Sequence, residues 1–455
     1  MTAPETAEVP PAPGGSRGRL PVVLRNPAFG AVWAAQVLTQ AAARMFQVGV
    51  VWWLVGHAMG ADRGFASGAF LAVSTLPAVV LVPLVARIIA RCRHRTVLAG
   101  AAALAGLVAS ATAVWAHTED LPTGAVYGAA LLLAGCQALF DPCLTTSVPE
   151  LVDDADIEAA TGFELATQSL AGLAGGLLGP LVVDAWDLAG IVAGCAGGYL
   201  VAAVLVAVTR FPGAAGGPDA AADATAAPRR TLRQILADLP FIRRALFCFT
   251  AANVFTTAVY VVMPLYTRSV LHAQGSTVAA LEAALGLGTL AGSFTGARLP
   301  GSPTTVGGAC LGLMALALGL PGLVPDRTVA VAALIVAGWC VGVIGVRFVA
   351  LFQRSVPAAD KPGFFAVMQA VLGATFPLSS LIFGVLGDHL EPRWLCVLQG
   401  VGLLPVAVAL FLLGRRERAA RDGAAPQGDA DPQADDAAGH EAVLPAAATS
   451  AGVSR

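Results

Sequence analysis

The sequence has little charge and almost no lysine. Only 12% of its 455 residues are charged and 56% are hydrophobic, whereas a soluble domain of ordinary composition carries roughly 25% charged residues. Its one lysine, Lys361, stands in Asp-Lys-Pro, so the chain has no Gly-Lys-Ser/Thr phosphate-binding loop of the kind found in ATP-driven pumps. The composition therefore predicts a polytopic membrane protein that carries no ATPase motor.

Patterns for metals, disulfides and hydrolytic chemistry are also missing. The eight cysteines include no Cys-x-x-Cys pair, and the six histidines have no metal-ligand spacing, so neither a zinc site nor a disulfide framework is indicated. The sequence contains no His-Glu-x-x-His and no Gly-x-Ser-x-Gly, the signatures of zinc proteases and serine hydrolases. Most arginines lie in short loops and in the linker, without interleaved aromatic residues. We therefore expect no metal, no cofactor, no enzymatic activity and no nucleic-acid partner.

Long apolar runs dominate what is present. A helix needs about 20 apolar residues to cross a bilayer, and backbone groups in hydrocarbon must bond within the segment, which favours helices for runs of this length. The runs lack the alternation of a transmembrane barrel. We predict an all-α integral membrane protein with twelve transmembrane helices, which begin near residues 28, 65, 96, 122, 157, 187, 241, 277, 304, 328, 362 and 393.

The distribution of arginine predicts the orientation. With twelve spans, the basic residues fall mainly on one side, and the other side has only Arg63, Arg268, Arg327 and Arg393. Basic loops are retained in the cytoplasm, so both termini are expected there, in a multi-pass protein of the cytoplasmic membrane. An odd number of spans would scramble this bias.

Two segments of similar pattern indicate a duplicated chain. Ser147-Val-Pro149-Glu begins a polar loop, which is followed by an apolar run that ends at Asp184. Ser355-Val-Pro357 begins a second such loop, and its apolar run ends at Asp388. We expect two pseudo-symmetric six-helix bundles. The predicted organisation is a flexible N-terminal segment 1–24, bundles at 25–210 and 241–414, a linker at 211–240, and a disordered cytoplasmic tail at 415–455.

Short motifs recur at the ends of the predicted spans. They are Arg25-Asn-Pro-Ala-Phe29-Gly-Ala-Val-Trp33-Ala-Ala-Gln36, Arg44-Met-Phe-Gln47, Trp52-Trp53-Leu54, Leu76-Pro77, Pro83-Leu84, Phe140-Asp-Pro142, Val148-Pro149-Glu150-Leu151-Val152 and Gln353-Arg354-Ser355-Val356-Pro357. In this order they resemble the major facilitator superfamily, and within it the branch that holds macrolide-efflux and enterobactin-exporter-like proteins. The resemblance implies a secondary transporter whose spans 1, 4, 7 and 10 line a central cavity.

The chain departs from that family pattern at two charged positions. In the loop after span 2, Arg91 and Arg95 match the family's basic residues, but Ala90 stands where the family has an acid. In the family that acid helps to lock the halves together on the cytoplasmic side, and this chain lacks it. In span 1 the branch often has Gly-Asp before the arginine, whereas this chain has Ala42-Ala43-Arg44.

Span 5 is rich in glycine. Gly175-x-x-x-Gly179-Pro180, with Gly172 one turn earlier, resembles part of the signature of the exchangers in this superfamily. Small residues four apart let helices approach closely, and a proline bends a helix. Two interpretations remain open, namely plain packing and a seam along which the halves rock.

Charges inside the predicted spans are candidates for function because each costs about 2.5–3.5 kcal/mol at mid-bilayer. Our hypothesis is that Arg44 and Glu164 face the cavity and that Glu164 carries the coupling proton. A structural ion pair and snorkelling to the interface are the alternatives. The full candidate set for the substrate and proton pathway is Arg44, Glu164, Gln40, Asn253, Tyr260, Glu282, Arg347 and Gln369.

These observations predict a monomeric exporter of a drug, siderophore or secondary metabolite that works by proton antiport. Its expected partners are the small-molecule substrate, protons and the lipid bilayer. An importer or symporter of the same fold is one alternative. A membrane scaffold or sensor that transports nothing is the other.

Overall fold

The computed structural model describes residues 22–57, 62–152, 156–211, 240–357 and 361–423. The predicted flexible N-terminal segment, central linker and disordered tail lie largely outside these ranges. Every element within the described ranges is a helix. The first half contains α1 (Val22–Arg25), α2 (Pro27–His57), α3 (Arg63–Val80), α4 (Val82–Arg91), α5 (His94–Thr118), α6 (Thr123–Leu151) and α7 (Ile157–Val208). The second half contains α9 (Pro240–Thr257), α10 (Val259–Ser269), α11 (Gly275–Gly296), α12 (Pro303–Leu323), α13 (Arg327–Ser355), α14 (Lys361–His389) and α15 (Pro392–Gly423).

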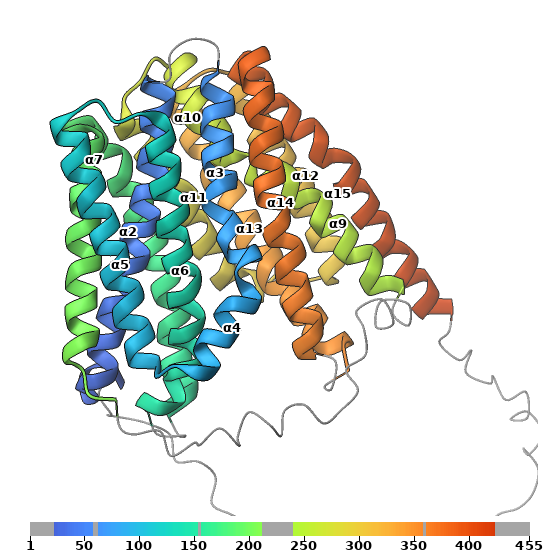
Figure 1. Ribbon diagram of the computed structural model, residues 1–455. Coiled ribbons are helices and arrows are strands. Elements are labelled where there is room, and N and C mark those ends of the chain that lie inside the picture. The colour runs from blue at the N-terminus through green and yellow to red at the C-terminus, as the bar shows by residue number, and fades with distance from the viewer. Residues whose placement is uncertain (1–21, 58–61, 153–155, 212–239, 358–360, 424–455) are drawn as a thin grey trace, which may run out of the picture. The chain divides into compact units, whose positions relative to one another are not determined.

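The helices run between two ends of the bundle (Figure 1). We call the end where α4 finishes at Arg91 and α9 begins at Pro240 the linker end. The opposite end, where α7 carries Asp184 and α14 carries Asp388, is the distal end. Helices α3 and α4 are consecutive parts of one bent rod, because Pro77 lies in the last turn of α3 and Leu81 separates the two.

Helix α7 contains a reversal of the chain. Asp187 has a φ of 56°, a left-handed conformation that ends the regular helix. Before it, Gly179 lies against Met45 and Gly49 of α2. After it, the Cys195 thiol donates to the Ala42 carbonyl, further back along α2. The residues on either side of Asp187 therefore run along α2 in opposite directions.

Ten helices of the described chain are long and apolar enough to cross a membrane. Helix α2 is not among them because Arg44 and several glutamines lower its hydropathy, and α7 is counted once, as Leu170–Val208. That stretch is 39 residues long, about 58 Å of straight helix, whereas the hydrocarbon core is about 30 Å thick. The twelve-span count, in which α2 is one span and Asp187 divides α7, stays a prediction, as does the location of the termini.

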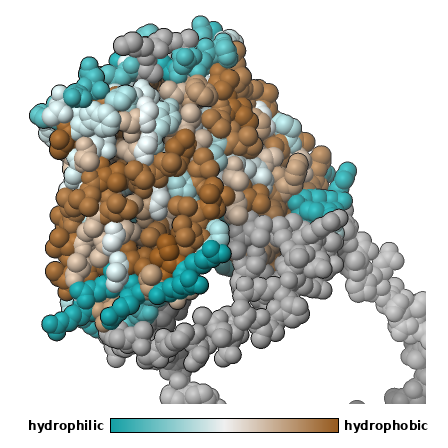
Figure 2. Space-filling model, viewed as in Figure 1, coloured by the Kyte–Doolittle hydropathy of each residue, from teal (hydrophilic) through white to brown (hydrophobic). Residues whose placement is uncertain are grey.

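The outer surface suits a bilayer. Large apolar side chains such as Leu107, Phe247, Phe294 and Leu316 are more than half exposed. Figure 2 shows apolar residues over the middle of the visible face and polar residues toward its ends. In water such a surface would associate, whereas lipid solvates it.

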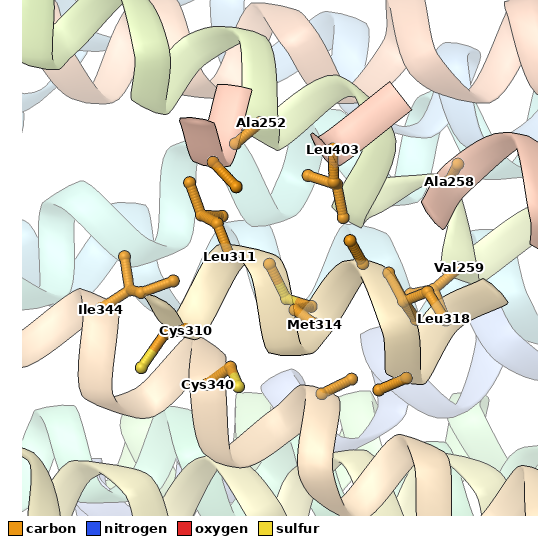
Figure 3. Close-up of a cluster of buried hydrophobic side chains, with 14 of the residues drawn as sticks. Ala252, Ala258, Val259, Cys310, Leu311, Met314, Leu318, Cys340, Ile344 and Leu403 are labelled. Atoms are coloured by element: carbon orange, nitrogen blue, oxygen red, sulfur yellow. The ribbon is translucent and has the colours of Figure 1, made fainter. Parts of the chain in front are cut away.

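Three clusters of buried side chains form the interior. The largest belongs to the second half, where Leu311, Met314 and Leu318 of α12 pack against α9, α10, α13 and α15 (Figure 3). A second cluster lies in the first half but also takes in Val261, Leu265 and Val278 from the second half. The third, near the linker end, is built from the first half alone. Packing between the halves is therefore concentrated toward the distal end.

Candidate functional site

A polar stripe runs along one face of α2. Trp33, Gln36, Gln40, Arg44 and Gln47 are spaced three or four residues apart, so they share a face of the helix. Polar side chains of this kind do not stabilise a helix surface that faces lipid. The stripe faces other helices instead. This face of α2 is therefore a candidate binding surface.

Arg44 is the centre of this stripe and reaches across to the other half. Its guanidinium donates to Gln47 Oε1 at 2.7 Å and to Glu282 Oε2 of α11 at 3.2 Å. The same group lies 4.6 Å from the ring centroid of Tyr260 in α10, within the range of a cation–π contact. One cation from the first half is thus held by an acid and an aromatic ring from the second.

Two glycines of α7 make room for this pair. A Cβ on Gly175 would lie 2.7 Å from the Cβ of Arg44, and a Cβ on Gly176 would lie 3.2 Å from Glu282 Oε2. Both glycines are buried. Gly175 and Gly179 lie against α2 of their own half, and a Cβ on Gly172 would have no neighbour within 4 Å. Part of the glycine pattern of span 5 therefore serves packing within the first half, and Gly176 serves the contact between halves.

The Arg44–Glu282 pair is only partly shielded from water. The side chains are 21% and 15% exposed. Removing one partner of a buried pair is destabilising by about 3–5 kcal/mol because the other charge stays unpaired. Partial exposure reduces this penalty without removing it.

A second polar group lies nearer the linker end. The Gln40 and Gln137 amides donate to Asp141 Oδ1 at 3.3 and 2.6 Å. Gln36 is 2% exposed, and its Nε2, like Gln40 Oε1, has no hydrogen-bond partner among the described residues. Buried amides are normally satisfied, so these two atoms are available to a ligand or to water.

The other predicted pathway residues take separate positions. Asn253 donates to the Leu372 carbonyl at 3.1 Å and to Thr375 Oγ1, which ties α9 to α14. Arg347 of α13 donates to the Leu299 carbonyl, beyond the end of α11. Gln369 is exposed on α14. The structure thus brings together Arg44, Tyr260 and Glu282, with Gln40 next to them along the stripe, but not Asn253 or Arg347.

Several predicted residues lie near the linker end. Arg91 is exposed at the end of α4, Arg95 donates to the Ala207 carbonyl in the last turn of α7, and Pro357 is exposed after α13. The side chains of Pro149 and Glu164 lie outside the described residues, although both positions are helical. The hypothesis that Glu164 meets Arg44 therefore stays a prediction.

One open hollow of the described chain lies away from the Arg44 site. It is an open groove of about 1880 Å³ at the linker end of the first half, bordered by α4 and by the ends of α5, α6 and α7. Its polar border includes His94 and Glu150, whose Nδ1 and Oε1 lie 2.8 Å apart. Because the groove joins elements of one half only, we do not assign it to the contact between halves.

Sequence reasoning missed three members of this site. Gln47 continues the spacing of three or four residues that begins at Trp33, and that regularity was a usable signal. Asp141 and Gln137 are four residues apart on α6, which also places them on one face. Nothing in the sequence indicated that Arg44 contacts Glu282, since 238 residues separate them.

Comparison with known proteins fits this architecture. The sequence model of the Major Facilitator Superfamily matches residues 32–303. Macrolide efflux protein A of Streptococcus pyogenes is 19% identical over 396 residues, which cover 84% of this chain and 94% of that protein.

Two solved structures have the same fold. A bacterial homolog of the human lysosomal transporter Spinster, in an inward-facing and occupied conformation, superposes with a TM-score of 0.69 at 14% identity, over 88% of this chain and 98% of the other. The nucleoside transporter NupG gives a TM-score of 0.64 at 11% identity, over 85% of this chain and 98% of the other.

Proposed function

This chain belongs to the Major Facilitator Superfamily, and we propose that it exports a drug, siderophore or secondary metabolite by proton antiport. It is a multi-pass transport protein of the cell membrane, not an enzyme. The direction of transport is supported by the similarity to Macrolide efflux protein A, which extends over most of both chains. Macrolides are large amphiphilic molecules, and they are the first compounds to test.

The contact between Arg44 and Glu282 is the observation that carries the proposal. One partner lies in each half, so movement of α11 away from α2 at this level breaks the pair. Transporters of this class move by rocking one bundle against the other around a site near the midplane. In this chain the candidate for that site is the cross-half ion pair, with the aromatic ring and the polar stripe beside it.

Glu282 is our candidate for the coupling proton. When the halves separate at the distal end, its carboxylate loses Arg44, and an unpaired carboxylate in an apolar surround is costly. Protonation from the outer solution removes that cost. When the halves rejoin and the linker end is open, the pair forms again and the proton leaves toward the cytoplasm. Protons thus move inward as substrate moves outward, and Glu164 is the second acid to test for this role.

Transport direction is tested with membrane vesicles. Inverted vesicles that contain the full chain are expected to accumulate a radiolabelled macrolide when a proton gradient, acid inside, is imposed. Right-side-out vesicles are expected not to accumulate it. The opposite pattern would support an importer of the same fold and would overturn the proposal.

The coupling role is tested with Glu282→Gln. This variant is expected to let the macrolide equilibrate across the membrane but to lose its accumulation against a gradient. The matched control is Glu391→Gln, which neutralises an acid that is 69% exposed and paired with Arg393 at 3.0 Å outside the site. Wild-type accumulation by Glu282→Gln would contradict the role of Glu282 and would direct attention to Glu164.

A scaffold or sensor that transports nothing predicts a different result. A transporter with its site at Arg44 is expected to gain thermal stability from a saturating macrolide, because a ligand that binds the folded state raises its stability. The gain is expected to vanish in Arg44→Ala. A gain of the same size in that variant would argue against the site.

A further inference from the structure

Helices α3 and α11 both begin at the distal end, and neither has a side-chain cap from its own N-cap residue. The residues at their N-cap positions, Asp62 and Gln274, make no side-chain hydrogen bond to the helix. The first N–H groups of a helix have no partner within it, and an N-terminus carries a partial positive charge that favours an acid. Each of these two ends therefore needs an acceptor from elsewhere.

The missing acceptor of α11 comes from the other half. Asp184 of α7 accepts a hydrogen bond from the Gly275 N–H, at 2.6 Å, through Oδ2. Its Oδ1 accepts from Trp52 Nε1 at 2.7 Å. A Cβ on Gly275 would lie 2.8 Å from that carboxylate and 2.6 Å from the Pro180 carbonyl, so glycine is what lets the two chain segments approach this closely.

The missing acceptor of α3 is supplied in the reverse direction. Asp388, near the end of α14, accepts from the Gly64 N–H at 2.6 Å through Oδ1 and from the Phe65 N–H at 2.8 Å through Oδ2. Again a glycine permits the approach, because a Cβ on Gly64 would lie 2.3 Å from the Gly384 carbonyl. Hydrogen bonds between a side-chain carboxylate and the N–H groups at a helix N-terminus are about twice as strong as neutral ones.

The two acids hold equivalent places in the duplicated sequence. Asp184 and Asp388 end the two apolar runs that follow the Ser-Val-Pro loops. Each acid caps a helix of the opposite half, so the two contacts are reciprocal. We propose that Asp184 and Asp388 form a paired latch that holds the distal end closed, and that both caps must break for the transporter to open there.

A cap of the same kind serves as an internal contrast. Asp326, at the start of α13, accepts from the Thr328 and Val329 N–H groups at 2.8 and 3.0 Å. This contact lies within the second half and does not join the halves. Loss of the Asp326 cap should therefore loosen α13 locally and leave the distal contact between halves unchanged.

Hydrogen–deuterium exchange on the full chain in nanodiscs tests the latch. In Asp184→Ala, we expect at least tenfold faster exchange at the start of α11, and a comparable increase at the start of α3, which Asp184 does not touch. Asp388→Ala is expected to give the same two increases. The increase at the remote helix is the decisive reading, because a purely local cap would affect only its own helix.

Asp326→Ala is the matched control and is expected to speed exchange at the start of α13 alone. If Asp184→Ala and Asp388→Ala behave as Asp326→Ala does, each changing only the helix that it caps, the latch is refuted. Should an alanine variant fail to fold, the asparagine variant, which keeps one acceptor oxygen, replaces it and is expected to give a smaller increase at both helices. The inference rests on the proposed rocking movement, but the experiment uses no substrate or gradient. The latch can therefore be refuted while the proposal of export stands, and export can be refuted while the latch stands.

Discussion

Adding one methyl group at Gly68 should separate the two halves without unfolding either. Gly68 of α3 faces α14 of the other half, and a Cβ placed there would lie 2.1 Å from the Ser380 carbonyl oxygen. Gly64 and Gly384 are in the same close contact. This seam between α3 and α14 has no room for a larger side chain, so Gly68→Ala is a test of how the halves are joined.

The expected magnitude follows from the overlap. Ordinary contact begins near 3.4 Å, so the new methyl group is about 1.3 Å too close to the carbonyl. Overpacking of this kind costs roughly 1–3 kcal/mol. If the halves move apart to relieve it, the ratio of distal-open to distal-closed molecules rises by roughly 5- to 140-fold, since about 1.4 kcal/mol is a factor of ten.

Gly292→Ala is the matched control. A Cβ on Gly292 of α11 would lie 2.1 Å from the Trp339 carbonyl oxygen of α13, the same overlap as at Gly68. Both of these helices belong to the second half, so movement of one half against the other cannot relieve the overlap between them. The gain in helix propensity from glycine to alanine, up to about 1 kcal/mol, is common to both variants and cancels in the comparison.

Two assays separate the outcomes. Gly68→Ala is expected to speed hydrogen exchange at the start of α11 and to lower the melting temperature little. Gly292→Ala is expected to lower the melting temperature and to leave exchange at the start of α11 near the wild-type rate. If Gly68→Ala lowers the melting temperature as much as Gly292→Ala and leaves exchange unchanged, the α3–α14 seam is not a place where the halves part.

Three further predictions concern single residues. Arg347→Ala removes the hydrogen bond to the Leu299 carbonyl and is expected to lower the free energy of unfolding by about 1.5–3 kcal/mol; a change in the macrolide Kd instead would place Arg347 in the binding site. Hydrogen bonds from the Val329 and Thr328 N–H groups lower the pKa of Asp326 below its ordinary 3.8. The Asp326 cap is therefore fully present above pH 3.8 and is lost as the pH falls through the lowered pKa. Hydrogen exchange at the start of α13, measured against pH, should show this loss, and Asp326→Asn should remove the pH dependence. Glu164→Gln is expected to weaken the dependence of macrolide accumulation on the proton gradient if Glu164 shares the coupling role, and wild-type dependence would exclude it.

The class of fold could be read from the sequence because hydrophobic length and the lack of alternation decide it. The runs from residue 63 onward correspond to helices of the structure. The first predicted run corresponds to helix α2, although Arg44 and its glutamines lower the hydropathy of that helix. The reversal at Asp187 coincides with the predicted start of a new span near residue 187. Local chemistry was sufficient for these features.

The partners of the charged residues could not be read from the sequence. Arg44 was matched with Glu164 because both lie in the first half, whereas the described contact is with Glu282, across 238 residues. Arg347 was another candidate for the pathway, but its guanidinium donates to a backbone carbonyl. Both cases depend on how the halves are packed, and no periodicity within one helix carries that information. The acidic ends of the repeats were visible, but the helices that they cap were not.

A disulfide across the halves tests the central claim that transport requires the two halves to move against each other. An ideal Cβ at Gly286 of α11 would lie 4.0 Å from the Cβ of Leu173 in α7, within the 3.5–4.5 Å range of disulfide bonds. In Leu173→Cys/Gly286→Cys, oxidation should stop macrolide accumulation by inverted vesicles, and a reductant should restore it, while each single variant transports in both conditions. Undiminished transport by the fully cross-linked protein would contradict the account.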